Sequence, residues 1–308
     1  MNANLKFSIV TPSYNEEKDI RGTLESFLAL SYSNKEILIV DDSSDKTPEI
    51  VKEYASRGVR LINGPRKGCC EAVNLGIQEA TGDIIVQADA DVRPPKDFLE
   101  RLAEKYEAGA DWVLVDSQIP EYNTNSVFSR FSGAQHIYEH PLERTDMLYA
   151  EAFSCRRDLA IKHDMFGPSY PARFCRDWLL GKKLTEVGYN KVYDPSIIVE
   201  HPQPDNFKEF WATRTARGRF GPFKQYFMDN YPLPRMFVRL ILKDIKFVLR
   251  FLLIVPGVSK ALKLVRYSKR GRKDFFPFLY VYFFQEVARC FGEWEGFLVD
   301  LKHSRATQ

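Results

Sequence analysis

The sequence lacks the features that mark secreted, membrane-spanning and zinc-binding proteins. Only five of the 308 residues are cysteine and none forms a C-x-x-C pair, so we expect reduced thiols in a cytosolic compartment. No run of about 18 apolar residues is free of charge, and therefore no ordinary membrane span is expected. A strand-like run begins at Phe7, which leaves no room for a signal peptide.

Strong charge of either sign is also missing. The formal net charge is only +3, which excludes a polycation that binds nucleic acid through its overall charge. A hydrophobic content of 44% and a charged content of 28% are typical of a globular protein, and this length predicts about two domains. The composition becomes aromatic, basic and apolar after residue 205.

The first half of the chain alternates short apolar runs with amphipathic stretches. One helix is well signalled, with Thr47 as N-cap, Pro48 in the first turn and Gly58 after the end. The repeated strand–helix pattern predicts an α/β fold, with a mostly parallel sheet and helices on both faces. The expected strands are 7–12, 36–42, 59–64, 83–91 and 111–116, and the expected helices are 16–30, 47–57, 68–80 and 95–108. A helix near 125–140, a return to the sheet at 149–159, and a last helix and strand within 173–202 complete a predicted catalytic domain of residues 1–205.

Acidic residues follow several of these strands at their carboxyl ends, where open parallel sheets bind ligands. In an extended chain Asp89 and Asp91 share one face, and like charges held so close repel each other. A divalent cation relieves this repulsion, since hard cations take carboxylate oxygens. The alternative is an acidic loop that caps a helix, because Pro94 and Pro95 begin one.

Five motifs in this order resemble family 2 glycosyltransferases. That family has the GT-A fold and uses nucleotide-diphosphate sugars with a divalent metal. The motifs, within residues 6–202, are "TPSYNEE" (11–17), "IVDDSSDKT" (39–47), "GPRKGCCEAVNLG" (64–76), "DADVRPP" (89–95), and "RDW" (176–178) followed by "EHP" (200–202).

The resemblance implies a site for Mn²⁺ or Mg²⁺. Asp91 matches the main metal ligand, and Asp89 matches a residue that contacts the ribose or a metal-bound water. His201 matches a position that completes the metal shell or contacts the diphosphate in some relatives. The alternative for His201 is a structural histidine in a turn before proline.

The resemblance also implies a nucleotide-sugar site. A tyrosine can stack on the base, a carboxylate can accept a ring N–H, and a basic pair at a helix start can hold the diphosphate. The alternatives are packing for Tyr14, helix-dipole charge for Glu16, and ordinary solvated loop charges for the basic pair. The matching positions are Pro12, Tyr14, Glu16, Asp42, Arg66 and Lys67, together with Asp89.

Asp177 matches the catalytic base of the family, which deprotonates the acceptor hydroxyl during one in-line displacement with inversion. The usual Glu-Asp pair reads Arg176-Asp177 here, so the first position can tune the acceptor instead. The alternative is an ordinary aspartate at a helix N-terminus. A Q-x-x-R-W motif of processive relatives is absent, and "RTARGRFG" (214–221) stands in that region, which favours transfer of a single sugar.

Residues 206–308 predict a helical region at a membrane surface. In the apolar stretch 235–255, five basic residues fall within a stripe about 80° wide, which suits a helix at headgroup level. The basic segment 259–273 can meet anionic lipid, and the apolar stretch 275–296 carries two glycines that permit close helix contact. The alternative is that both helices pack on the catalytic domain or form a dimer contact. The five basic residues are Arg235, Arg239, Lys243, Lys246 and Arg250, and the glycines are Gly292 and Gly296.

These features predict an inverting, metal-dependent transfer of one sugar from a UDP- or GDP-sugar to a hydroxyl or phosphate acceptor. "TPSYNEE" and "VDDSSDKT" are similar to dolichyl-phosphate sugar synthases, so we expect a lipid-linked acceptor and a peripheral position on the cytoplasmic face of a membrane. One alternative is an inactive sugar-nucleotide-binding membrane scaffold. Another is a soluble glycan-extending transferase whose C-terminal helices mediate dimerisation. Dehydrogenases and P-loop enzymes are excluded because neither G-x-G-x-x-G nor a P-loop is present, and aspartyl-phosphate phosphohydrolases carry their D-x-D on the first strand.

Overall fold

The computed structural model describes residues 5–139, 151–167, 177–252 and 255–306, and the side chain of Asp177 is outside this description. The chain forms two compact units. The first unit comprises the described parts of 1–118 and 142–201, and the second comprises those of 119–141 and 202–308.

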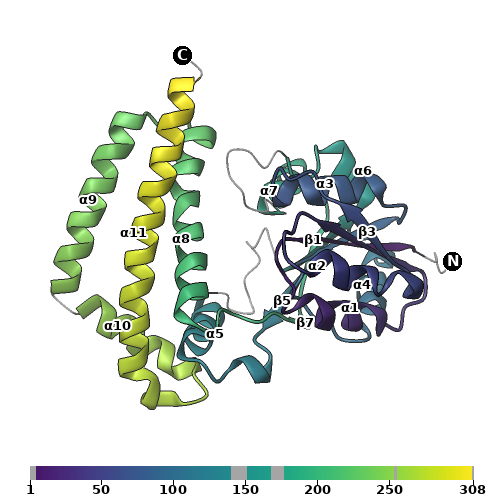
Figure 1. The fold of residues 1–308 in the computed structure, drawn as a ribbon, viewed down its shortest axis with the longest axis horizontal. Coiled ribbons are helices and arrows are strands. Elements are labelled where there is room, and N and C mark those ends of the chain that lie inside the picture. The colour runs from purple at the N-terminus through teal and green to yellow at the C-terminus, as the bar shows by residue number, and fades with distance from the viewer. Residues whose placement is uncertain (1–4, 140–150, 168–176, 253–254, 307–308) are drawn as a thin grey trace. The chain divides into compact units, whose positions relative to one another are not determined.

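The first unit is built on a seven-stranded sheet (Figure 1). The strand order is β3-β2-β1-β4-β6-β5-β7, and all neighbouring strands are parallel except where β6 pairs with β4 and β5. The predicted α/β fold with a mostly parallel sheet is therefore confirmed. The strands are β1 Phe7–Ser13, β2 Lys35–Asp41, β3 Val59–Asn63, β4 Ile84–Ala88, β5 Trp112–Gln118, β6 Ala152–Arg156 and β7 Lys191–Glu200.

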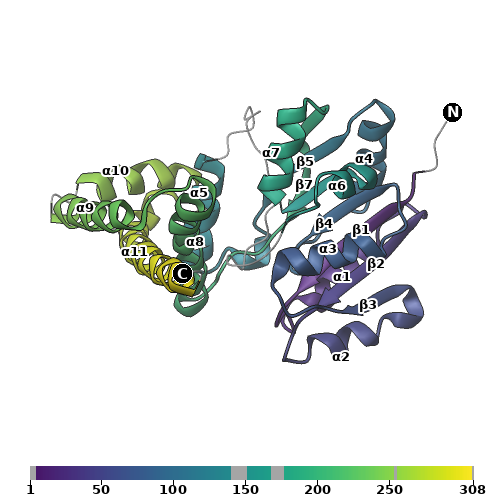
Figure 2. The same cartoon turned by 90° about the horizontal axis from the view of Figure 1, so that it is seen from above.

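Helices cover both faces of this sheet, and each face has its own hydrophobic core (Figures 1 and 2). Phe7 and Ile9 of β1 belong to one core, whereas Val10 belongs to the other. Burial on both sides explains why the central strands read as continuous apolar runs. One core is closed by α1 Ile20–Leu28, α2 Thr47–Lys52 and α4 Phe98–Glu107, and the other by α3 Cys69–Glu79, α6 Arg157–Lys162 and α7 Asp177–Val187.

The predicted helix at 47–57 is divided into α2 and a short 3₁₀ turn, Ala55–Arg57. Gly58 ends it in the left-handed conformation, as the sequence predicts, with φ of 91°. Thr47 is not the N-cap, because it is already the first helical residue. Its hydroxyl instead donates to Asp45 and accepts from the backbone N–H of Glu16.

The second unit is helical. Its helices α8 and α11 approach closely because glycines line their contact: a Cβ on Gly292 would collide with the carbonyl oxygen of Thr215, and one on Gly296 would lie 2.8 Å from that of Arg219. The predicted close contact through these two glycines is confirmed. The helices are α5 Val127–Glu139, α8 Phe207–Phe223, α9 Leu233–Leu252, α10 Val255–Leu264 and α11 Phe275–Ala306, with short turns at Glu121–Asn123, Lys224–Met228, Val265–Tyr267 and Gly271–Asp274.

The boundary between the units differs from the predicted division into 1–205 and 206–308. Residues 119–141, expected in the first domain, belong to the second unit. The reason is the packing of α5, where Arg130 forms two hydrogen bonds to the buried carboxylate of Asp274, at 2.8 and 2.9 Å. The Phe131 ring also packs edge-on against Phe278.

Two expectations concern the environment of the chain. Among the described helices, none combines the length and the apolar character that crossing a membrane requires. Of the described cysteines, Cys70, Cys155 and Cys290 form no disulfide, whereas Cys69 is disulfide-bonded, so the expectation of reduced cysteines is wrong at that position.

Candidate metal and nucleotide-sugar site

A cavity of about 1010 Å³ lies in the first unit and is lined by residues that follow β1, β2, β4 and β7. These strands share one direction, so their carboxyl ends meet at the same edge of the sheet. The structure thereby brings together every predicted site residue except Asp177. The nine are Pro12, Tyr14, Glu16, Asp42, Arg66, Lys67, Asp89, Asp91 and His201.

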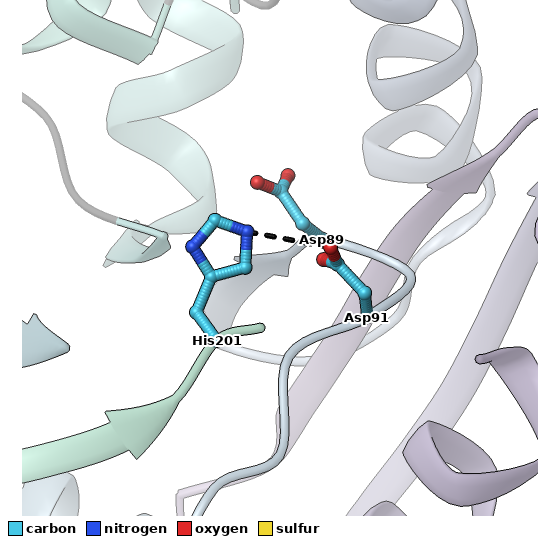
Figure 3. A group of neighbouring side chains, drawn as sticks. All are labelled: Asp89, Asp91 and His201. Carbon is cyan, nitrogen blue, oxygen red and sulfur yellow. Dashed lines mark ion pairs between the residues drawn. The ribbon is translucent and has the colours of Figure 1, made fainter. Parts of the chain in front are cut away.

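The potential metal ligands lie side by side in this cavity (Figure 3). One ligand atom each of Asp89, Asp91 and His201 lies within 4.8 Å of the others. His201 Nε2 is 3.4 Å from Asp91 Oδ2, and the Gln87 side chain donates to Asp89 Oδ1 at 2.9 Å. The two carboxylates offer hard oxygens that suit Mn²⁺ or Mg²⁺, and the imidazole nitrogen as a third ligand favours the transition metal, Mn²⁺.

The two aspartates converge for a different reason from the one that the sequence predicts. β4 ends at Ala88, so Asp89 and Asp91 are not alternate residues of a strand. They lie in a turn, in which the backbone N–H of Val92 donates to the carbonyl of Asp89 at 3.1 Å. The turn, rather than strand alternation, directs both carboxylates into the cavity.

Glu151 is a further member of the cluster that the sequence analysis missed. Its Oε1 lies 3.7 Å from His201 Nδ1, so the imidazole stands between two carboxylates. Glu151 precedes β6, whose first residue Ala152 pairs with Ala88 in antiparallel register. The first residue of an antiparallel strand lies beside the last residue of its neighbour, so the acid before "AFSCR" lies next to the end of β4. This acid could have indicated the site in the sequence only if the direction of β6 had been known.

The electrostatics of the cluster indicate an uncompensated negative charge. Burial and the charge of Asp91 raise the pKa of Asp89 to about 6. Burial, with the charges of Asp91, Asp19 and Asp89, raises the pKa of Glu16 to about 8. Burial alone would lower the pKa of His201, but Asp91 and Glu151 raise it well above its usual value. A bound cation would neutralise the negative charge that these protons otherwise neutralise, so the residues present fit a metal.

Two neighbouring aspartates, Asp41 and Asp42, have different roles. Asp41 is buried, and its Oδ1 accepts hydrogen bonds from the hydroxyls of Ser13 and Ser43 at 2.6 and 2.7 Å, which fixes the strand end. Asp42 lines the cavity, and its Oδ1 accepts from the backbone N–H of Arg66 at 2.7 Å. Only Asp42 is therefore available to a ligand.

The loop before α3 supplies positive charge to the same cavity. Arg66 and Gly68 both have left-handed φ angles, 53° and 103°, which turn the chain sharply into the N-terminus of α3. Lys67 lies between them and lines the cavity. Cationic side chains and free N–H groups at a helix start attract phosphate.

Tyr14 and Glu16 belong to a loop that is held by two residues after β2, one of them the first residue of α2. The backbone N–H groups of Asn15 and Glu16 donate to the hydroxyls of Ser43 and Thr47, at 2.7 and 2.8 Å. The side chain of Tyr14 is 65% exposed, so its ring is free to stack on a base.

Asp177 is the first residue of α7. Its side chain lies outside the described residues, as does Arg176 of the same motif. The assignment of Asp177 as catalytic base therefore remains a prediction.

The chain is similar in sequence to known glycosyltransferases. The family model described as glycosyl transferase family 2 matches residues 8–166. The chain is 36% identical over 114 residues to a dolichol-phosphate mannosyltransferase of Pyrococcus furiosus, over 36% of this chain and 32% of that protein. It is 27% identical over 277 residues to the probable glycosyltransferase YdaM of Bacillus subtilis, over 82% of this chain and 64% of that protein. The chain thus spans less than two thirds of the length of either relative.

Solved structures are similar in fold. The mannosyltransferase PcManGT from Pyrobaculum calidifontis, solved in complex with GDP-Man and Mn²⁺, superposes with a TM-score of 0.54 at 19% identity. The match covers 99% of this chain and 76% of that one. The predicted GT-A fold is thereby confirmed.

Proposed function

The chain belongs to glycosyl transferase family 2, and from this membership we propose that it transfers one sugar from a nucleotide-diphosphate sugar to a hydroxyl or phosphate acceptor. One observation carries the proposal: the cluster of Asp89, Asp91 and His201 shares a cavity with the basic residues Arg66 and Lys67. Carboxylates that can hold a cation, next to basic groups that attract phosphate, are what a departing nucleoside diphosphate requires.

In this proposal the donor lies along the cavity. Tyr14 stacks on the base, and Asp42 accepts a hydrogen bond from it. Arg66, Lys67 and the N-terminus of α3 hold the diphosphate. A divalent cation, Mn²⁺ or Mg²⁺, held by Asp89, Asp91 and His201, would supply compensation for the negative charge on the leaving group. The GDP-Man and Mn²⁺ of the similar mannosyltransferase structure support this assignment.

Asp177 is proposed as the base that removes the proton from the acceptor. A single displacement by the deprotonated hydroxyl inverts the anomeric centre and needs one carboxylate on the acceptor side. The match of "RDW" to the family motif supports this role, and Asp177 is the first residue of α7.

A lipid-linked acceptor at a membrane surface is the proposed second substrate. One relative is named for dolichol phosphate. The outer face of α9 supports a position on an anionic bilayer, peripheral on the cytoplasmic face. Seven large apolar side chains on this helix are exposed, and at about 100° per residue they cover an arc of about 140° beside the basic stripe. They are Phe237, Val238, Ile241, Leu242, Ile245, Val248 and Leu249.

Release of nucleotide tests the proposal. The protein is incubated with a panel of UDP- and GDP-sugars and Mn²⁺, with and without vesicles that contain a polyprenyl phosphate. We expect one donor to be consumed when acceptor is present, and Asp91→Ala or Asp177→Ala to slow this by about 100-fold or more. Asp97→Ala, an exposed carboxylate outside the cavity, is the matched control. Turnover that persists in Asp91→Ala contradicts the assignment, and donor binding without turnover favours the inactive scaffold.

A further inference from the structure

A second cavity, of about 570 Å³, lies within the helical unit between α9, α10 and α11. Its volume falls within the range of about 300–1,000 Å³ that is common for small-molecule sites. No step of the proposed transfer uses it. Its wall is mostly aromatic and aliphatic, with side chains that include Phe247, Leu279, Tyr280 and Phe283.

Aromatic contacts join α9 and α11 beside this cavity. There, Phe237 packs against Trp294 and Phe297, with ring centroids 5.8 and 6.0 Å apart. Further along, the two helices meet through the stacked rings of Phe247 and Phe283, whose centroids are 6.4 Å apart.

The helix α10 contributes a glycine to this cavity. A Cβ on Gly257 would lie 2.9 Å from Leu279 Cδ1, so the backbone of α10 comes close to α11 here. The rim on α11 is open to solvent, since Phe276 is 76% exposed and Tyr280 is 54% exposed. The cavity is therefore apolar inside and accessible from outside.

One end of the cavity is cationic. The lining contains Lys243, Lys246 and Arg289 against a single carboxylate, that of Glu286. Arg289 pairs with Glu286 at 2.8 Å, and both Arg289 and Lys243 pair with Glu293. Within the described part of the chain, Lys246 has no ion-pair partner, and its side chain is exposed. It supplies one uncompensated positive charge at the mouth of an apolar site.

We propose that this cavity binds a single anionic lipid, with the acyl or prenyl chain among the aromatic side chains and the head group at Lys246. Charge complementarity selects an anionic amphiphile over an apolar peptide or a neutral chain. The bilayer is the source, because Lys246 also borders the exposed apolar face of α9. The site is stoichiometric, one lipid per chain, and it does not depend on the proposed glycosyl transfer.

A fluorescent fatty acid tests this without any bilayer present. cis-Parinaric acid and its uncharged methyl ester have the same chain and become fluorescent in apolar sites. We expect one saturable site per protein chain for the acid, and binding of the ester that is about tenfold weaker. Lys246→Glu should weaken binding of the acid by about tenfold or more and leave the ester unchanged, since tenfold corresponds to about 1.4 kcal/mol.

Arg235→Glu is the matched control. Arg235 belongs to the same basic stripe and is also exposed, but it does not line the cavity. It should leave the binding of both probes unchanged. Leu279→Trp, which fills the cavity, should abolish binding of both probes. The proposal is overturned if Lys246→Glu and Arg235→Glu weaken the acid equally, if acid and ester bind equally well, or if binding does not saturate.

Discussion

Burial and like charge act together on individual carboxylates of the cavity. Asp89 and Glu16 have raised pKa values, of about 6 and about 8, because each is buried beside other acids. In the absence of a cation Glu16 holds a proton at neutral pH, and Asp89 holds one below about pH 6. Metal binding must then displace those protons, which couples metal affinity to pH.

We therefore predict that Mn²⁺ affinity rises with pH. Below about pH 6 Asp89 is protonated and binding is weak; affinity increases as Asp89 and Glu16 lose their protons, and also as His201, whose pKa is raised well above its usual value, loses the proton that blocks its ring nitrogen. Calorimetric titration between pH 5.5 and 8.5 measures this. Glu16→Gln should reduce the upper part of the rise and retain the lower part, which belongs to Asp89. An affinity independent of pH would show that the protons are not displaced.

Asp300 offers a second test at a single residue. It is buried in α11, its Oδ2 has no hydrogen-bond partner among the described residues, and burial raises its pKa from 3.8 to about 7. Between these values the folded state binds a proton that the unfolded state does not, so the free energy of unfolding falls as pH rises from about 4 to 7. The loss is up to about 4 kcal/mol.

Asp300→Asn removes this titration. The variant should be more stable than the wild type at pH 8 and similar at pH 4.5, as measured by urea denaturation at both values. Asp229→Asn, at an exposed position of the same unit, is the control and should not alter the pH dependence. An unchanged pH profile in Asp300→Asn would contradict the assignment.

The nine residues that line the cavity could be named from the resemblance of the motifs, and they lie together because the carboxyl ends of parallel strands meet at one edge. Glu151 could not be predicted, since its place depends on the antiparallel direction of β6, which "AFSCR" does not reveal. The alternation argument for Asp89 and Asp91 reached the right pair by the wrong geometry, because it assumed that the strand continued past Ala88.

At the scale of elements, the contact between α8 and α11 depends on backbone proximity. Gly292→Ala would bring a methyl group into the carbonyl oxygen of Thr215, which cannot rotate away as a side chain can. We predict a loss of about 1–3 kcal/mol or more, measured as a lower denaturation midpoint. Gly221→Ala on α8, where a Cβ meets nothing within 4 Å, should have little effect. Equal effects would show that the close packing does not matter for stability.

The exposed face of α9 makes a second prediction. Ile245 is 51% exposed, so Ile245→Glu should preserve folding. The charged side chain would no longer insert into a bilayer, and the affinity for anionic liposomes measured by flotation should fall by about tenfold. Val187→Glu on α7, exposed at 58% but outside this helix, is the matched control. Liposome binding that survives Ile245→Glu would favour a role for α9 in packing or dimerisation.

Most elements could be predicted from periodicity, including α5, β6 and α9. The partner of each element could not. The segment 119–141 looked continuous with the first domain, and its assignment to the second unit rests on tertiary contacts such as the buried pair of Arg130 and Asp274. Likewise, no local signal shows that β6 separates β4 from β5. Which distant segments lie next to each other depends on tertiary packing, and this packing cannot be predicted from the local pattern of a single sequence.

At the scale of the whole molecule, the two units have distinct chemistry. The first has an acidic and basic cavity at the edge of a mostly parallel sheet, and the second has an exposed apolar helix beside a basic stripe, in addition to the apolar cavity that the transfer does not use. This division matches a polar donor and an amphiphilic acceptor, the two substrates of the proposed reaction. The proposed function depends most on the first unit, since no sugar can be transferred without a bound nucleotide sugar.

Calorimetric titration of UDP and GDP in the presence of Mn²⁺, repeated in EDTA and with Asp91→Asn, tests that dependence most directly. We predict one saturable site for one of the two nucleotides in Mn²⁺, no measurable binding in EDTA, and binding weaker by about tenfold or more in Asp91→Asn. Equal affinity for the nucleotide in EDTA, or in Asp91→Asn with Mn²⁺, would contradict the claim that this cluster holds a cation against the diphosphate.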